Sequence, residues 1–150
     1  MSSDERIVSE TASISAPPAT VFAILADPHQ HERIDGSGSV KGNVKGPRVL
    51  SKGAKFGVDM KMFGVPYKIR NVVVEYEQDR RIAWRHFGAH RWRYEITPTD
   101  GGCEVTESWD ASRYVTPIWL GLKLAGFPER NKQGIAGTLV KLREAAERDA

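Results

Sequence analysis

Three side chains that could move a proton fall on neighbouring predicted strands: His86, Tyr94 and Glu107. In each strand apolar and polar residues alternate, so these side chains share one face if the strands pair with each other. An imidazole and a carboxylate within reach of each other can act as general acid and base. A tyrosine hydroxyl beside them can donate a hydrogen bond to a developing enolate oxygen. The sequence therefore predicts His86, Glu107 and Tyr94 as candidate catalytic residues.

A structural role for the same residues is the competing interpretation. His86 would then lie half-exposed near a strand end, and Glu107 would pair with an arginine across the sheet. Opposite charges on adjacent strands commonly pair in this way. A facing that is wrong by one residue would put both groups in water. The sequence leaves both interpretations open.

Apolar and aromatic side chains accompany these polar groups on the predicted inward faces of the strands and of the last helix. A pocket for a small ligand has such a wall, mostly apolar with a few polar groups that orient the ligand. The aromatic residues can equally be core mass. The predicted ligand-binding residues are Val58, Met60, Met62, Trp84, Trp92, Trp109, Trp119, Leu122, Phe127, Ile135 and Leu139.

The order of predicted elements places these residues. One strand over residues 6–15 is followed by short helices over 19–26 and 28–34, and then by a run of antiparallel-type strands from Lys52 to residue 111. The facing of residues 67–78 is not fixed, and a bulge is expected at Val72–Val74. A helix over about 129–148 closes the chain, with an apolar stripe that must lie on the sheet. The pattern indicates an α+β fold.

The segment 114–127 is apolar but interrupted by Pro117, Gly121 and Gly126. These breakers predict a link without regular structure before the last helix. Trp119 lies in this link, where a lid over a pocket would be. Three roles are open for Trp119: contact with a ligand, contact with a membrane, or packing.

Several stretches resemble the START/Bet v 1-like (SRPBCC) superfamily, in its bacterial polyketide cyclase/dehydrase branch. They are residues 14–28 (ISAPPATVFAILADP), 31–40 (HERIDGSGSV), 81–84 (RIAW) and 134–142 (GIAGTLVKL). The resemblance implies a helix-grip fold, in which a curved antiparallel sheet of six to seven strands wraps around a long C-terminal helix, with two short helices after the first strand. It also implies an apolar cavity under that helix for a small hydrophobic ligand.

Binding of a lipid, polyketide-like or aromatic molecule is the leading functional prediction, because the resemblance implies a shared apolar cavity. It does not imply one activity, since members of one fold family differ in what they do. A polyketide cyclase/dehydratase using an inward His/Glu pair is the first alternative. A protein-interaction module, such as an antitoxin or a chaperone-activator-like protein, is the second. We expect a monomer or a weak homodimer with a possible protein partner.

The bulk properties fit one globular domain over residues 1–150, with residues 1–5 as a disordered tail. The net charge of +3 comes from dispersed basic residues, so we expect no nucleic-acid partner. No stretch is long and apolar enough for stable membrane insertion. The N-terminus has no apolar signal region and Cys103 is the only cysteine, so a cytoplasmic location is expected.

No cofactor or metal is expected. His29 and His31 are two residues apart, so a helix would not put them on one face. Only Glu32 or Asp35 could add ligands, and structural zinc sites usually have four protein ligands. The loop over residues 35–39 lacks the lysine and the spacing of a phosphate-binding loop. We predict that it lies at the mouth of the cavity.

Overall fold

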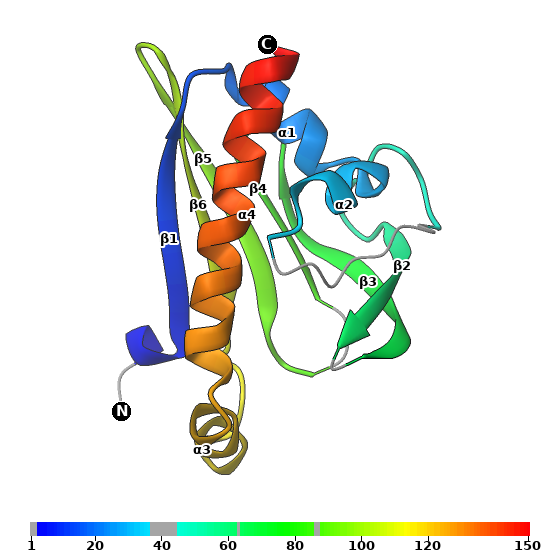
Figure 1. The fold of residues 1–150 in the computed structure, drawn as a ribbon, viewed down its shortest axis with the longest axis vertical. Coiled ribbons are helices and arrows are strands. Elements are labelled where there is room, and N and C mark those ends of the chain that lie inside the picture. Colours follow the sequence, from blue (N-terminus) through cyan, green and yellow to red (C-terminus); the bar gives the residue numbers. More distant parts are fainter. Residues whose placement is uncertain (1–2, 37–44, 63, 86–87) are drawn as a thin grey trace.

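The structure is a computed structural model that describes residues 3–36, 45–62, 64–85 and 88–150. Six antiparallel strands form one sheet, and the long last helix lies across its concave face (Figure 1). The predicted α+β helix-grip architecture is confirmed. The strands are β1 (Ile7–Ile14), β2 (Lys55–Met62), β3 (Val65–Glu77), β4 (Arg81–Arg85), β5 (Arg91–Thr99) and β6 (Gly102–Asp110). The helices are η1 (Ser3–Arg6), α1 (Pro18–Leu25), η2 (Pro28–Gln30), α2 (His31–Ile34), α3 (Thr116–Leu124) and α4 (Phe127–Asp149).

The strand order is β1-β6-β5-β4-β3-β2, so the first strand pairs with the last one. Directly opposed residues on antiparallel strands have their side chains on the same face. One row across the concave face therefore contains Glu10, Glu107, Tyr94 and Ile82, which are successive partners in the register. This row lies in the middle of the sheet, beneath α4.

Strand β3 contains the predicted bulge. The register with β4 shifts between Val73 and Glu75, so Val74 is the extra residue. The bulge brings both Val73 and Tyr76 to the core, although they are three residues apart. Period-two alternation could not have predicted that facing.

Helix α4 contacts the sheet through the predicted stripe. Ile135, Leu139 and Leu142 are 1%, 3% and 0% exposed. The helix begins after Gly126, whose φ of 83° turns the chain sharply between α3 and α4. No helix in the described ranges is both long and apolar enough to cross a bilayer.

The sequence predicts a mobile link over 114–127, whereas in the structure residues 116–124 form helix α3. Pro117 lies in the first turn, where its missing N–H costs no hydrogen bond. Trp119 is 1% exposed, and its ring centroid lies 6.3 Å from that of Trp109. This single buried anchor fixes a helix that its glycine and proline content disfavours.

The predicted tail also has some structure, since Ser3–Arg6 form the short turn η1. Its first two residues lie outside the described ranges. Arg6 donates from Nη1 to the carbonyl of Tyr114 at 2.8 Å and from Nη2 to Oγ1 of Thr116 at 3.0 Å. The guanidinium carbon also lies 5.8 Å from the centroid of the Trp119 ring. The start of the chain therefore holds α3 in place.

Candidate functional site

Two of the three candidate catalytic residues meet beneath α4. Tyr94 on β5 and Glu107 on β6 are direct partners in the register, and their side chains are hydrogen-bonded. They are 5% and 4% exposed. Glu107 therefore does not pair with an arginine across the sheet, and it does not face water.

The environment of Glu107 favours its protonated form. Burial raises the pKa of this carboxyl from 4.5 to about 8, and the negative charge of Asp35 adds to the rise, while the hydrogen bond from Tyr94 opposes it. Its Oε1 is buried and has no hydrogen-bond partner among the described residues. An unpartnered polar atom in an apolar interior is costly, and the proton held on the carboxyl avoids the larger cost of a buried charge.

Asp35 belongs to the same site, although the sequence indicated for it only a place at the cavity mouth. Its charge raises the pKa of Tyr94 and of Tyr67 as well as that of Glu107, in each case after the larger effect of burial. Asp35 directly follows α2, and Lys141 of α4 donates to its carbonyl at 3.0 Å. The end of α2 therefore places a carboxylate whose charge acts on the Tyr94–Glu107 pair.

Gly36 holds this segment against α4. Its amide donates to Oγ1 of Thr138 at 3.0 Å. A Cβ built on Gly36 would lie 2.1 Å from the amide nitrogen of Thr138 and 2.4 Å from the carbonyl carbon of Gly137. A Cβ on Gly137 would in turn meet Gly36 at 3.3 Å. Two glycines in contact thus let the backbone after α2 approach the helix backbone.

Replacing Gly36 by alanine is expected to destabilise the protein by about 1–3 kcal/mol, since either α4 or the segment after α2 must move. Chemical unfolding measures the loss. Gly101→Ala is the matched control, because a Cβ there meets nothing within 4 Å. Equal stability of the two variants would contradict the close contact.

The third candidate catalytic residue, His86, lies outside the described residues, as do the side chains of Val58 and Met62. The remaining predicted ligand-binding residues lie on strands of the sheet or on helices α3 and α4. Met60, Trp84, Trp92, Leu122 and Phe127 are half-buried against the core, while Trp109, Trp119, Ile135 and Leu139 lie within it. Trp119 is packed, the third of its possible roles.

His31 has a structural place beside this site. Its Nε2 is 2.8 Å from the carbonyl oxygen of Leu25, and its ring stacks on Trp84 with centroids 4.8 Å apart. Burial lowers its pKa, so the ring is neutral at neutral pH. Within the described ranges no three His, Cys, Asp or Glu side chains are grouped so that they could hold a metal ion.

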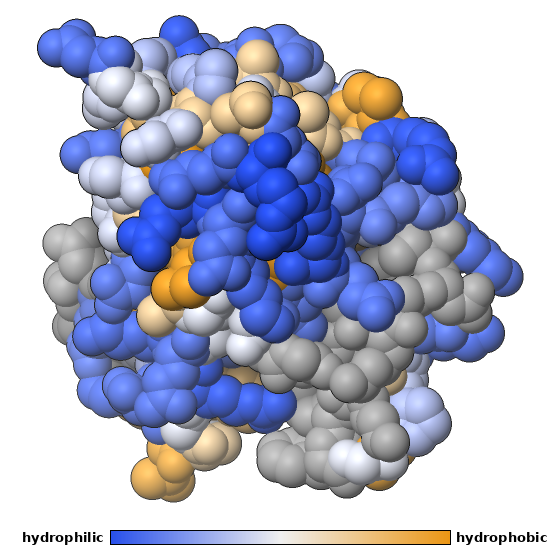
Figure 2. Space-filling view, turned by 45° about the horizontal axis from the view of Figure 1, so that its top comes forward, coloured by the Kyte–Doolittle hydropathy of each residue, from blue (hydrophilic) through white to orange (hydrophobic). Residues whose placement is uncertain are grey.

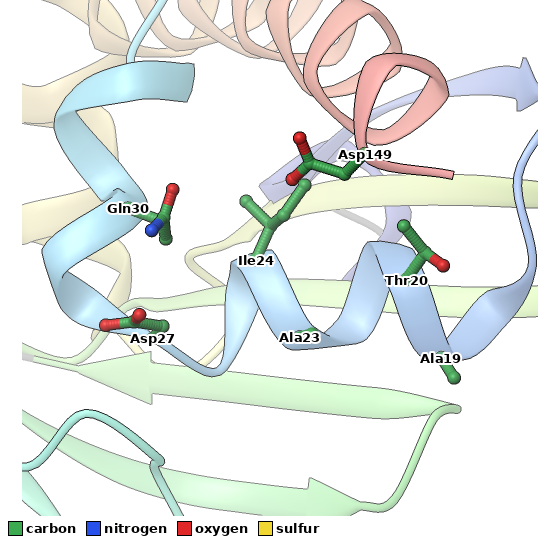
Figure 3. Close-up of a pocket in the computed structure, with 7 residues that line it drawn as sticks. All are labelled: Ala19, Thr20, Ala23, Ile24, Asp27, Gln30 and Asp149. Carbon is green, nitrogen blue, oxygen red and sulfur yellow. The ribbon is translucent and has the colours of Figure 1, made fainter.

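A separate pocket lies on the surface between α1 and the end of α4 (Figure 3). Its volume is about 490 Å³, and none of its residues is among the predicted ligand-binding ones. The carboxylate of Asp149 at its edge accepts two hydrogen bonds, of 2.6 and 2.8 Å, from the guanidinium of Arg33. The lining residues are Ala19, Thr20, Ala23, Ile24, Asp27, Gln30 and Asp149.

Comparison with known proteins gives both sequence relatives and structural neighbours. Uncharacterized protein Rv0088 of Mycobacterium tuberculosis is 42% identical over 141 residues, which cover 90% of this chain and 62% of that protein. A protein of another strain of that organism, MT0096, is 41% identical over the same length. The chain thus spans about three fifths of the length of the curated relatives it matches.

Solved structures with little sequence identity share the fold. Protein SA2116 of Staphylococcus aureus has a TM-score of 0.72 at 12% identity, with 95% of this chain and 94% of that chain covered. NE0264 of Nitrosomonas europaea has a TM-score of 0.69 at 19% identity, with 97% and 96% covered. The Aha1 dimer of Colwellia psychrerythraea has a TM-score of 0.65 at 13% identity, with 94% and 96% covered.

The sequence match to a family is more specific than these likenesses of fold. Residues 5–147 match the family described as polyketide cyclase/dehydrase and lipid transport. This range contains every strand and nearly all of α4. The chain therefore belongs to the polyketide cyclase/dehydrase and lipid transport family, within the START/Bet v 1-like superfamily that its sequence resembles.

Proposed function

We propose that this chain binds a small, mostly apolar molecule between the sheet and α4, with its polar end at Glu107 and Tyr94. One observation carries the proposal: Oε1 of Glu107 is buried without a partner among the described residues. A neutral carboxyl there can both donate and accept a hydrogen bond, which suits a ligand carbonyl or hydroxyl group. The half-buried Trp84, Trp92 and Met60 supply apolar surface on the same side.

Native mass spectrometry of the freshly purified protein, followed by solvent extraction, tests this proposal. We expect an additional mass that extracts as an apolar compound carrying at least one oxygen. Chain without added mass that also fails to bind the fluorescent probe anilinonaphthalene sulfonate would contradict it. Extraction identifies the class of compound, which the family description leaves open.

Two substitutions of Glu107 distinguish the hydrogen bonding of its side chain from the space that the side chain fills. Glu107→Leu removes the hydrogen bond to the ligand and should lower the bound fraction roughly tenfold. Glu107→Gln keeps the hydrogen-bonding capacity and should retain the ligand. Glu104→Leu, on the exposed side of the same strand, is the control and should leave binding unchanged. Full retention of ligand by Glu107→Leu would exclude Glu107 from the site.

A cyclase or dehydratase activity is the second candidate function. A carboxyl whose pKa is about 8 is close to the pH at which general acids and bases work best. In this candidate function Tyr94 donates a hydrogen bond to the oxyanion that develops on the substrate. The discriminating result is turnover: the enzyme makes a product from the extracted compound or its precursor, and Glu107→Gln still binds that precursor but makes no product. A compound that the wild-type protein returns unchanged supports binding alone.

A further inference from the structure

Helix α3 presents an apolar face to the outside. Seven large hydrophobic side chains are strongly exposed in the described part of the chain, and four of them belong to α3 or its N-cap. They are Val115, Ile118, Leu120 and Leu124, with 61%, 52%, 47% and 92% of their surface exposed. The other three are scattered singly over the 45–50 segment, β3 and α4. Such a concentration marks an interaction surface.

The apolar face is fixed in this orientation. Trp119 on the opposite side of α3 is buried against Trp109, and Arg6 bonds the backbone and the side chain at the start of the helix. The helix cannot turn Leu120 and Leu124 inward without removing Trp119 from the core. The fold therefore holds apolar surface in water, at a cost that a partner would offset.

The charges around the face favour an anionic partner. Residues 111–128 contain no Asp or Glu, and their two basic residues, Arg113 and Lys123, are 47% and 51% exposed. Each also contacts one carboxylate from outside this stretch, Asp110 and Glu5 respectively. Residues 111–134 contain four basic residues and one acidic residue. Their net charge of +3 equals that of the whole chain.

The shape favours a flat partner. Helix α3 lies at the extreme end of the molecule, beyond the start of α4, so it forms a ridge (Figure 1). The end turned forward in Figure 2 is mostly hydrophilic, with hydrophobic residues in small separate patches.

We propose that α3 docks this protein onto the surface of an anionic lipid bilayer. Ile118, Leu120 and Leu124 enter the headgroup region, and Arg113 and Lys123 contact lipid phosphates. A short helix with an apolar outward face and flanking basic residues has the properties of an interfacial anchor. The docking is peripheral and reversible, and it is independent of whether Glu107 binds a ligand.

Vesicle co-sedimentation of the whole chain tests the proposal. We expect binding to vesicles of equal parts phosphatidylglycerol and phosphatidylcholine, weaker binding at higher salt, and little binding to phosphatidylcholine alone. Leu120→Glu and Leu124→Glu should each lower the partition coefficient roughly tenfold. Leu124 is 92% exposed, so its substitution leaves the folded core intact.

Val140→Glu is the matched control: Val140 on α4 is 49% exposed, as Leu120 is 47% exposed, but it stands alone and lies outside α3, so its substitution should not affect binding. Equal binding to both kinds of vesicle, binding to neither, or equal losses in the control and in the α3 variants would overturn the proposal. A dimer in analytical ultracentrifugation that Leu124→Glu dissociates, without vesicle binding, would assign the face to a second copy instead.

Discussion

Replacing Glu107 by glutamine is expected to remove a large pH dependence from the stability of this protein. The folded state holds a proton on Glu107 up to a pKa of about 8, whereas an unfolded chain releases it near 4.5. Between these two values the folded state binds one more proton than the unfolded state. The stability that Glu107 contributes is therefore fully present below about pH 4.5 and falls as the pH rises through 8.

The expected size of this effect is about 5 kcal/mol over the full interval, at about 1.4 kcal/mol for each pH unit. Glutamine cannot ionise, so Glu107→Gln should gain stability relative to the wild type as the pH rises. Urea unfolding of both proteins from about pH 5 to about pH 9 measures the difference. Tyr94 and Glu10 oppose Glu107 on the neighbouring strands, and the charge of Asp35 acts on it; all three residues remain in the variant.

The difference in unfolding free energy between Glu107→Gln and the wild type reports on Glu107 more directly than the pH dependence of either protein alone. Burial lowers the pKa of His90 to about 4 and also lowers that of His31, so both histidines make stability rise with pH below about 6.5. These contributions cancel in the comparison because both variants contain them. Glu104→Gln on the same strand is the control and should follow the wild type. Parallel curves for Glu107→Gln and wild type would show that Glu107 is ionised throughout.

Replacing Glu75 by glutamine is expected to cost about 2 kcal/mol of unfolding free energy at neutral pH, because it leaves Arg91 without its carboxylate and Arg93 with Asp110 alone. Glu75 lies on the convex face of the sheet and accepts from Arg93 at 2.7 and 3.0 Å and from Arg91 at 2.9 Å. Arg93 also donates to Asp110 at 3.1 Å. The side chains of Glu75 and Arg93 are only 19% and 14% exposed, so solvent screens this pair weakly.

The free energy of unfolding at acid pH provides a second measurement of the contribution of Glu75. The hydrogen bonds from Arg93 and Arg91 lower the pKa of Glu75 from 4.5 to about 2. Its contribution is therefore present above about pH 4.5 and is lost as the pH falls through 2, a loss that Glu75→Gln should not show. Glu95→Gln is the control, because its pair with Arg81 is 43–45% exposed and worth less than about 1 kcal/mol. Equal costs for the two variants would exclude a special role for the Glu75 pair.

The sequence predicted the concave face well where strands alternate regularly. Trp92, Tyr94 and Ile96 pair in register with Trp109, Glu107 and Val105. The facing of one apolar residue therefore determines the facing of the residues opposite it on the next strand. The contact between Tyr94 and Glu107 follows from that alternation. The sequence could not predict that Glu107 is protonated, because the pKa of its carboxyl depends on burial by other elements of the fold.

Two features escaped prediction because they depend on distant residues. Helix α3 has Pro117, Gly121 and Gly126 in or beside it, and local propensity alone disfavours a helix there; Trp119 and Arg6 stabilise it from other parts of the chain. Asp35 reaches the site because Gly36 contacts the α4 backbone about a hundred residues later. A Gly directly after Asp35 was the only local sign of such an approach.

The pairing of β1 with β6 also has a consequence for the order of events in folding. Ile7 opposes Asp110, so β1 finds no partner until about a hundred further residues have been made. Hairpins among β2 to β6 close over short loops and can form earlier. Until β6 is made, β1 has no partner and β5 is an unprotected sheet edge. Crowded synthesis at high expression therefore favours edge-to-edge aggregation of incomplete chains, and slower synthesis should improve the yield of folded protein.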